Sequence, residues 1–163
     1  MEPHPLDVLS PDGTAFWLRL GMAVLCGGII GLERQLRGKA AGIRTSILIC
    51  LGTSVFVALG ASFQGTQVDP TRVLAQVVTG IGFLGGGVIL TREGLIVGVT
   101  SAAVIWMLAA LGSLIGLGHV TAAVVLTLVT VGILIGVELL ESFFRRLREG
   151  ATDRELNRID IDH

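Results

Sequence analysis

Charged side chains are scarce in this sequence. Asp, Glu, Lys and Arg make up only 15% of the 163 residues, whereas hydrophobic residues make up 52%. The mean hydropathy is +0.79, which lies well on the apolar side of a soluble domain. The composition therefore excludes an ordinary water-soluble protein. A chain of this length forms one domain, and most of this one must lie in the lipid bilayer.

Cysteine is rare, and the usual catalytic motifs are absent. Cys26 and Cys50 both fall inside apolar runs, without His or Cys at the spacing of metal ligands, so we predict that they are core residues. A disulfide between them is the alternative. The sequence offers no Ser/His/Asp set, HExxH, P-loop or carboxylate dyad. We therefore expect no catalytic residue, no cofactor and no nucleic-acid partner, while metal ligands stay undetermined.

Basic residues are missing from residues 1–14, which hold Glu2, Asp7 and Asp12. A secretory signal peptide needs a basic start before its apolar core, so this segment has the wrong charge. We expect it to remain as a short non-cytoplasmic tail.

Five apolar segments follow, and each is long enough to be predicted as a transmembrane helix. The predicted fold is an all-α polytopic membrane bundle over residues 15–140, with spans at 15–32, 46–63, 71–90, 99–117 and 120–140. Residues 141–163 are predicted to form a cytoplasmic amphipathic helix and a tail. Its apolar face carries Leu140, Phe143, Phe144 and Leu147, its arginines point away, and Gly150 is expected to end it.

The stretch Gln76–Leu90 is apolar, uncharged and rich in glycine. Small residues let membrane helices approach closely, so we predict that this is the most enclosed helix of the bundle. The glycines assigned to helix packing are Gly80, Gly82, Gly85 and Gly86. The same letters match the dinucleotide fingerprint GxGxxG, but no βαβ alternation surrounds them. We reject the nucleotide interpretation for that reason.

Polar residues gather at both ends of the predicted spans. We predict an outer-side polar cluster, formed by Arg19 near the start of the first span and by Asp69, Arg72 and Gln76 at the start of the third. Asp69 is also a predicted N-cap. Arg19 is expected to snorkel toward the headgroups, with a buried functional charge as the alternative. Residues 91–98 are too apolar for an exposed loop, and whether they re-enter the membrane stays open.

The distribution of charge predicts the topology. Residues 33–45 hold four basic side chains against one carboxylate, and the segment after residue 140 is rich in arginine. Short basic segments beside spans are typical of the cytoplasmic side. Five spans then place the N-terminus outside and the C-terminus in the cytoplasm.

Four segments of the sequence are specific in combination: Gly31–Arg34, Ala41–Thr45, Ala75–Gly85 and Thr100–Trp106. Together they resemble the membrane domain of the MgtC/SapB family of bacterial inner-membrane proteins. The resemblance covers residues 20–140 in the same order and with similar spacing. It implies a link to growth in low magnesium and to virulence. It also implies modulation of other membrane machinery, including the ATP synthase, and a short form without the cytoplasmic domain that many members carry.

Two functions remain in competition at this stage. A non-enzymatic modulator, binding another membrane protein or a second copy of itself, fits the small-residue helix faces. A magnesium transporter would need carboxylates within the membrane, yet the acidic residues lie near the predicted surfaces.

The resemblance also concentrates on residues near the first loop, which we therefore predict to form the functional network: Glu33, Arg34, Gly42, Arg44 and Thr45. Its central contact is an expected Glu33–Arg44 pair, with an exposed pair that only fixes the hairpin as the alternative.

Overall fold

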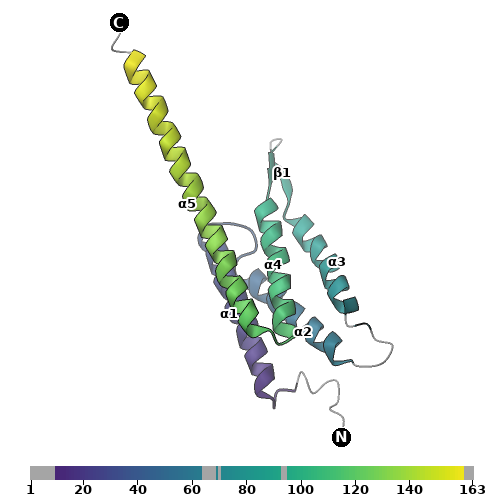
Figure 1. Cartoon of the computed structure of the whole chain (residues 1–163). Coiled ribbons are helices and arrows are strands. Elements are labelled where there is room, and N and C mark those ends of the chain that lie inside the picture. The colour runs from purple at the N-terminus through teal and green to yellow at the C-terminus, as the bar shows by residue number, and fades with distance from the viewer. Residues whose placement is uncertain (1–9, 64–68, 70, 93–94, 160–163) are drawn as a thin grey trace. The chain divides into compact units, whose positions relative to one another are not determined.

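We describe a computed structural model of the chain, which defines residues 10–63, 69, 71–92 and 95–159. Its elements are α1 (Thr14–Leu36), α2 (Ile43–Ser62), α3 (Thr71–Gly87), β1 (Leu90–Arg92), β2 (Leu95–Val97), α4 (Val99–Gly116) and α5 (Val120–Ile159), shown in Figure 1. The five predicted helices are thus confirmed in number and order. The chain divides into two compact units, one ending at Leu128 and the other beginning at Val129.

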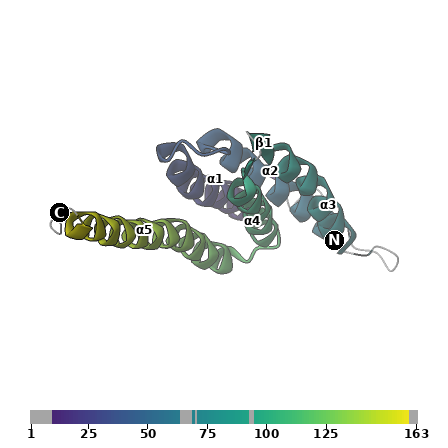
Figure 2. The ribbon, with the colours of Figure 1, turned by 90° about the horizontal axis from the view of Figure 1, so that it is seen from above.

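The core of the first unit is built by α1, α2 and α4. Helix α2 packs against α1 and against α4, and α1 also contacts α4. Figure 2 shows α3 lying on the side of this group away from α1. The largest side chains that are fully buried are aliphatic and come from α1 and α4: Ile30, Ile105, Leu108, Leu111 and Ile115. Cys26 and Cys50 are buried as free thiols, so the core assignment is confirmed and the disulfide alternative is excluded.

Glycines allow these three helices to approach one another. A Cβ atom added to Gly27 would lie 2.8 Å from the Ser46 carbonyl oxygen of α2. On the other side of α2, a Cβ atom on Gly116 of α4 would lie 2.6 Å from the Ser54 carbonyl oxygen. Real Cβ atoms do not come this close, so the backbones meet only because these residues lack side chains. Backbone approach of this kind is what holds helices together in lipid, where hydrophobicity gives no preference for helix–helix contact.

Helix α3 does not occupy the enclosed position predicted for it. Its only buried residues are Ile81 and Gly85. A Cβ atom on Gly80, Gly82 or Gly86 would meet nothing within 4 Å, whereas one on Gly85 would touch Ala102 of α4 at ordinary distances. The prediction of tight packing at Gly82 and Gly86 is therefore wrong for a single chain. The spacing of small residues shows that a helix can be approached closely, but it does not show by which helix.

Four helices are long and apolar enough to cross a membrane: α1, α2, α4 and the segment Val120–Leu140 of α5. The chain is thus a multi-pass membrane protein with four candidate spans. Helix α3 ends at Gly87 and has 17 residues, so it is roughly 26 Å long at 1.5 Å per residue. It falls just short of the ordinary spanning length of about 20 residues.

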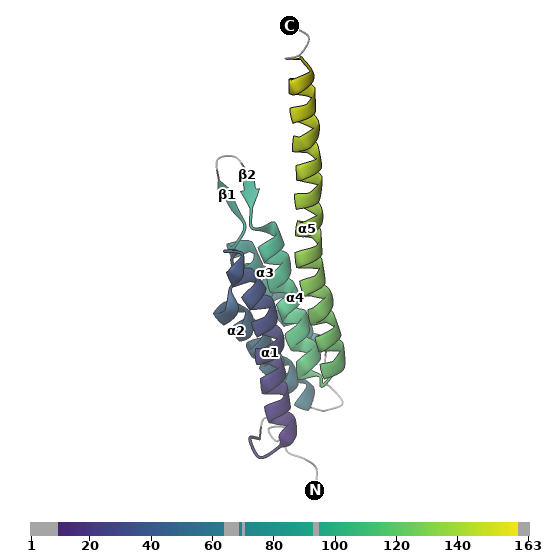
Figure 3. The same ribbon diagram turned by 90° about the vertical axis from the view of Figure 1, so that its left-hand side faces the viewer.

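A β-hairpin takes the place of a loop between α3 and α4. Strands β1 and β2 pair antiparallel, with Leu90 opposite Val97 and Arg92 opposite Leu95. Residues 90–92 and 95–97 are therefore non-helical, and the two strands extend beyond the ends of α3 and α4 rather than back along them (Figure 3). Gly98 joins it to α4 with a φ of 93°. A side chain there would collide with the Val88 carbonyl, so only glycine fits.

The second unit is the remainder of α5, a continuous helix to Ile159. The expectation that Gly150 ends the amphipathic helix is wrong, because the helix runs through it. A glycine inside a helix costs only about 1 kcal/mol relative to alanine, so good helix formers on both sides can outweigh it. The side chains of the predicted amphipathic face beyond Leu140 lie outside the described residues, as do residues 1–9 of the predicted tail.

Candidate functional site

The candidate site lies where α1 ends and where α2 and α4 begin. Helix α1 is apolar along most of its length and then closes with a charged turn that contains Glu33 and Arg34. A Cβ atom on Gly31, one turn earlier, would lie 2.6 Å from Cα of Ile43. The missing side chain thus lets the start of α2 close over the last turn of α1. As a result Glu33 and Arg34 are buried, with exposed fractions of 9% and 3%.

Glu33 is held by an ion pair within its own helix. Its Oε1 lies 2.6 Å from Nε of Arg37, one turn further along. Glu followed four residues later by a basic residue is a favourable arrangement on a helix. The predicted partner, Arg44, is not the one the structure uses. Helix α2 begins at Ile43, which places Arg44 in its first turn with an exposed side chain. The expected Glu33–Arg44 pair is therefore wrong.

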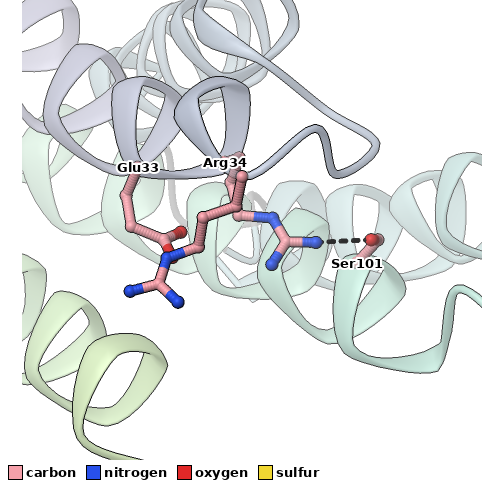
Figure 4. Close-up of polar contacts among 4 residues, drawn as sticks. Glu33, Arg34 and Ser101 are labelled. Atoms are coloured by element: carbon pink, nitrogen blue, oxygen red, sulfur yellow. Dashed lines mark hydrogen bonds and ion pairs between the residues drawn. The ribbon is translucent and has the colours of Figure 1, made fainter. Parts of the chain in front are cut away.

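Arg34 connects α1 to α4. Its Nη2 donates a hydrogen bond of 2.6 Å to Oγ of Ser101, and both side chains are buried (Figure 4). The two residues are 67 positions apart in the sequence. Since hydrogen bonds to a charged group are stronger than neutral ones, this contact is a specific tie between the two helices. Glu33, Arg34, Arg37 and Ser101 together are called the Glu33 cluster below.

Two atoms of the Glu33 cluster have no hydrogen-bond partner among the described residues. They are Oε2 of Glu33 and Nε of Arg34, both of them buried. A buried polar atom without a partner costs on the order of 1–3 kcal/mol, so native proteins keep few of them. One acceptor and one donor on adjacent residues thus remain available to a group that can both give and receive hydrogen bonds. These two atoms make the cluster the candidate site.

The other predicted members of this network have local roles. Gly42 is the N-cap residue of α2, and the Ile43 N–H donates to Oε1 of Gln35 at 3.3 Å. The side chain of Gln35 thus serves an N–H group that the helix itself cannot satisfy. Thr45 is exposed, and the Ser46 hydroxyl donates to the Ala41 carbonyl at 3.0 Å.

The residues predicted to form a second polar cluster, Arg19, Asp69, Arg72 and Gln76, are only partly brought together. Asp69 caps α3 as predicted, because its Oδ1 accepts hydrogen bonds from the Thr71 hydroxyl at 2.7 Å and the Thr71 N–H at 2.9 Å. These bonds, together with the positive charge of Arg72, lower the pKa of the Asp69 carboxyl. Arg72 and Gln76 line one groove, whereas Arg19 lines a separate small pocket between α1 and α2.

Sequence reasoning found Glu33 and Arg34 and missed Arg37 and Ser101. The spacing of Glu33 and Arg37 was readable as a helical pair. Ser101 carries no comparable signal, because its contact depends on how α4 packs. Within the part of the chain that the structure describes, no group of three or more His, Cys, Asp or Glu side chains could hold a metal ion.

Comparison with known proteins adds a further line of evidence. The profile of the MgtC family matches residues 20–143. A protein of Escherichia coli K12 named "Putative magnesium transporter YhiD" is 47% identical over 110 residues, which are 63% of this chain and 51% of that protein.

Two proteins named MgtC are also similar. The one from Brucella abortus is 42% identical over 136 residues, 81% of this chain and 56% of its own length. The one from Salmonella typhimurium is 47% identical over 103 residues, 63% of this chain and 43% of its own. The chain thus spans about half the length of these relatives. No solved structure matches it significantly.

Proposed function

The chain belongs to the MgtC family, and from that membership we propose that it is a non-enzymatic modulator of other membrane machinery during adaptation to low magnesium. The observation that carries this proposal is the position of the buried polar groups. Glu33 and Arg34 lie in the last turn of α1, and Ser101 lies in the first turn of α4. Deeper in α2, the buried polar groups are the hydroxyls of Thr53 and Ser54.

Transport pathways usually carry an ionisable residue within the membrane. The described bundle formed by α1, α2 and α4 instead keeps its buried charges at one end. Charges confined to one end form no path for an ion through the bundle, and this favours modulation over transport. The end of helix α3 supplies a second contact surface, since a Cβ atom on Gly86 or Gly87 would meet nothing within 4 Å. A helix of a partner membrane protein, or of a second copy of this chain, would pack there.

The second candidate is a small transporter or channel for magnesium or another divalent cation. It is favoured by the name of the Escherichia coli relative and by the unpartnered Oε2 of the buried Glu33. Magnesium binds carboxylate oxygens and keeps several of its waters, so a single carboxylate is a weak site by itself. We therefore rank transport below modulation.

Purified protein in liposomes that contain a magnesium-sensitive dye separates the two candidates. We expect magnesium entry no faster than into empty vesicles, because no chain of ionisable groups leads through the described bundle. Vesicles that hold the Glu33→Gln variant serve as the matched control. If magnesium enters much faster than into empty vesicles, and if the Glu33→Gln variant loses this entry, then the protein is a transporter and the modulator proposal is wrong.

We also propose that all five helices span a bacterial inner membrane, with the N-terminus outside and the C-terminus in the cytoplasm. Helix α3 runs antiparallel to α4 and packs along it (Figure 1). Its length is at the lower limit of a spanning helix. The basic residues between α1 and α2 then lie on the cytoplasmic side, as the positive-inside rule requires.

Reporter fusions test this topology. A fluorescent protein that folds only in the cytoplasm should glow when fused after His163 and stay dark when fused before residue 10. Alkaline phosphatase, active only outside the cytoplasm, should give the opposite pattern at the same two positions. If both ends report the same side, α3 does not cross the membrane and the chain has four spans.

A further inference from the structure

A groove of about 940 Å³ runs between α2 and α3. The two helices lie side by side (Figure 2) but make few contacts. They come close at Gly60 of α2 and Val73 of α3, because a Cβ atom added to Gly60 would collide with the Val73 side chain. Further along, a Cβ atom on Gly52 of α2 or Gly80 of α3 would meet nothing within 4 Å. The groove is therefore a gap that the side chains of this chain leave unfilled.

The lining of the groove is polar at one end and apolar over most of its length. Arg72 and Gln76 lie one turn apart in the first part of α3. Beyond them the walls consist largely of bulky apolar side chains that are about half exposed or more, among them Leu48, Phe56, Phe63 and Leu84. Along α2 the lining extends from Thr45 to Phe63, roughly 27 Å at 1.5 Å per residue. This is close to the thickness of the hydrocarbon core of a bilayer, about 30 Å.

The polar end offers hydrogen-bond donors to an anion. Arg72 carries a planar guanidinium with five N–H groups, which suits the oxygens of a phosphate. The described residues give the Gln76 side chain no hydrogen bond, although an amide at this depth needs a partner. The nearby Asp69 carboxylate already accepts two hydrogen bonds from Thr71 and does not line the groove. A donor-rich end, at which Arg72 lies near the Asp69 carboxylate, therefore continues into the apolar part of the groove.

We propose that this groove binds one anionic phospholipid, with its phosphate on Arg72 and Gln76 and an acyl chain along α2 and α3. The groove is complementary to an amphiphile, because one end offers a charged side chain and the remainder is lined by apolar side chains. A partner helix fits less well, because its apolar side chains would leave the donors of Arg72 and Gln76 without partners. The exposed apolar side chains of Phe56 and Leu84 would contact a hydrocarbon chain along the groove.

Native mass spectrometry of the whole chain tests this assignment. The protein is released from nanodiscs that contain equal amounts of phosphatidylglycerol and phosphatidylcholine. We expect the wild type to retain one phosphatidylglycerol. Arg72→Gln should reduce this retention roughly tenfold, as expected for the loss of a charged hydrogen bond. Arg44→Gln, the same change at an exposed arginine outside the groove, should leave it unaltered.

A second pair of variants fills the groove without touching the arginine. Gly80→Leu places a side chain into the open space of the groove, and we expect it to lower the retention of both lipids. Gly82→Leu, the matched control, makes the same change on α3 outside the groove lining, again with nothing within 4 Å.

Equal lipid retention in Gly80→Leu and Gly82→Leu would overturn the proposal, and so would equal retention in Arg72→Gln and Arg44→Gln. A second protein chain that is released with the wild type and lost in Gly80→Leu would show instead that a helix occupies the groove.

Discussion

Replacing Gly112 by leucine is expected to prevent the α1–α2–α4 core from assembling. A Cβ atom at this position of α4 would meet the Cys50 carbonyl oxygen of α2 and would lie 2.8 Å from Cβ of Thr53. Both obstacles belong to the central helix, one of them to its backbone, so the neighbour cannot yield by rotating a side chain. Overpacking costs typically about 1–3 kcal/mol, and here the helices themselves must separate. The expected result is little or no monodisperse protein on gel filtration in mild detergent.

Gly82→Leu is the control for Gly112→Leu. It introduces the same residue into α3, where a Cβ atom meets nothing within 4 Å, so its yield and its melting temperature should match those of the parent. Gly112→Ala provides an intermediate change and should lower the melting temperature without abolishing expression. If Gly112→Leu and Gly82→Leu purify and melt alike, the close contact between α2 and α4 is not what stabilises the bundle.

These two glycines also show how far the sequence determines the fold. The pairs Gly27/Gly31, Gly82/Gly86 and Gly112/Gly116 share the same spacing, and each is typical of a helix that is approached closely. Within the described residues, two of these pairs contact α2, whereas Gly82 and Gly86 face open space. The number of helices, their order and their apolar character follow from local hydrophobicity. Which helix lies in the centre depends on tertiary packing, which the spacing does not encode.

The candidate site illustrates the same limit. Glu33 and Arg34 stand out in the sequence because they are charges at the end of a long apolar run. The predicted Glu33–Arg44 pair fails because α2 begins three residues before the predicted start at residue 46. With α2 beginning at Ile43, Arg44 belongs to an exposed first turn and Arg37 supplies the charge. Ser101 could not be paired with Arg34 at all, since their contact joins residues 67 positions apart.

Changing Arg34 to lysine is the decisive test of the Glu33 cluster. Lysine keeps the positive charge but replaces the planar fork by a single ammonium group. It cannot reproduce both the hydrogen bond to Ser101 and an N–H at the position of the unpartnered Nε. Because a hydrogen bond to a charged group contributes about 1.5–3 kcal/mol, we expect a measurably lower melting temperature. In a bacterium that depends on this chain for growth in low magnesium, we expect growth to be lost.

Three further variants separate a functional site from a structural tie. Ser101→Ala removes the same hydrogen bond but leaves the Arg34 guanidinium in place. Glu33→Gln removes the negative charge of the neighbouring carboxylate. Arg44→Lys makes the same change at an exposed arginine at the same end of the bundle, and it should grow like the wild type. Protein levels in the membrane are measured alongside growth for every strain.

If Arg34→Lys grows normally, or fails only because the protein is missing, then the Glu33 cluster holds α1 and α4 together and has no further role. The other outcome is that Arg34→Lys loses growth at normal protein levels and that Ser101→Ala is less affected. This result would assign the function to the Arg34 guanidinium and its unpartnered Nε.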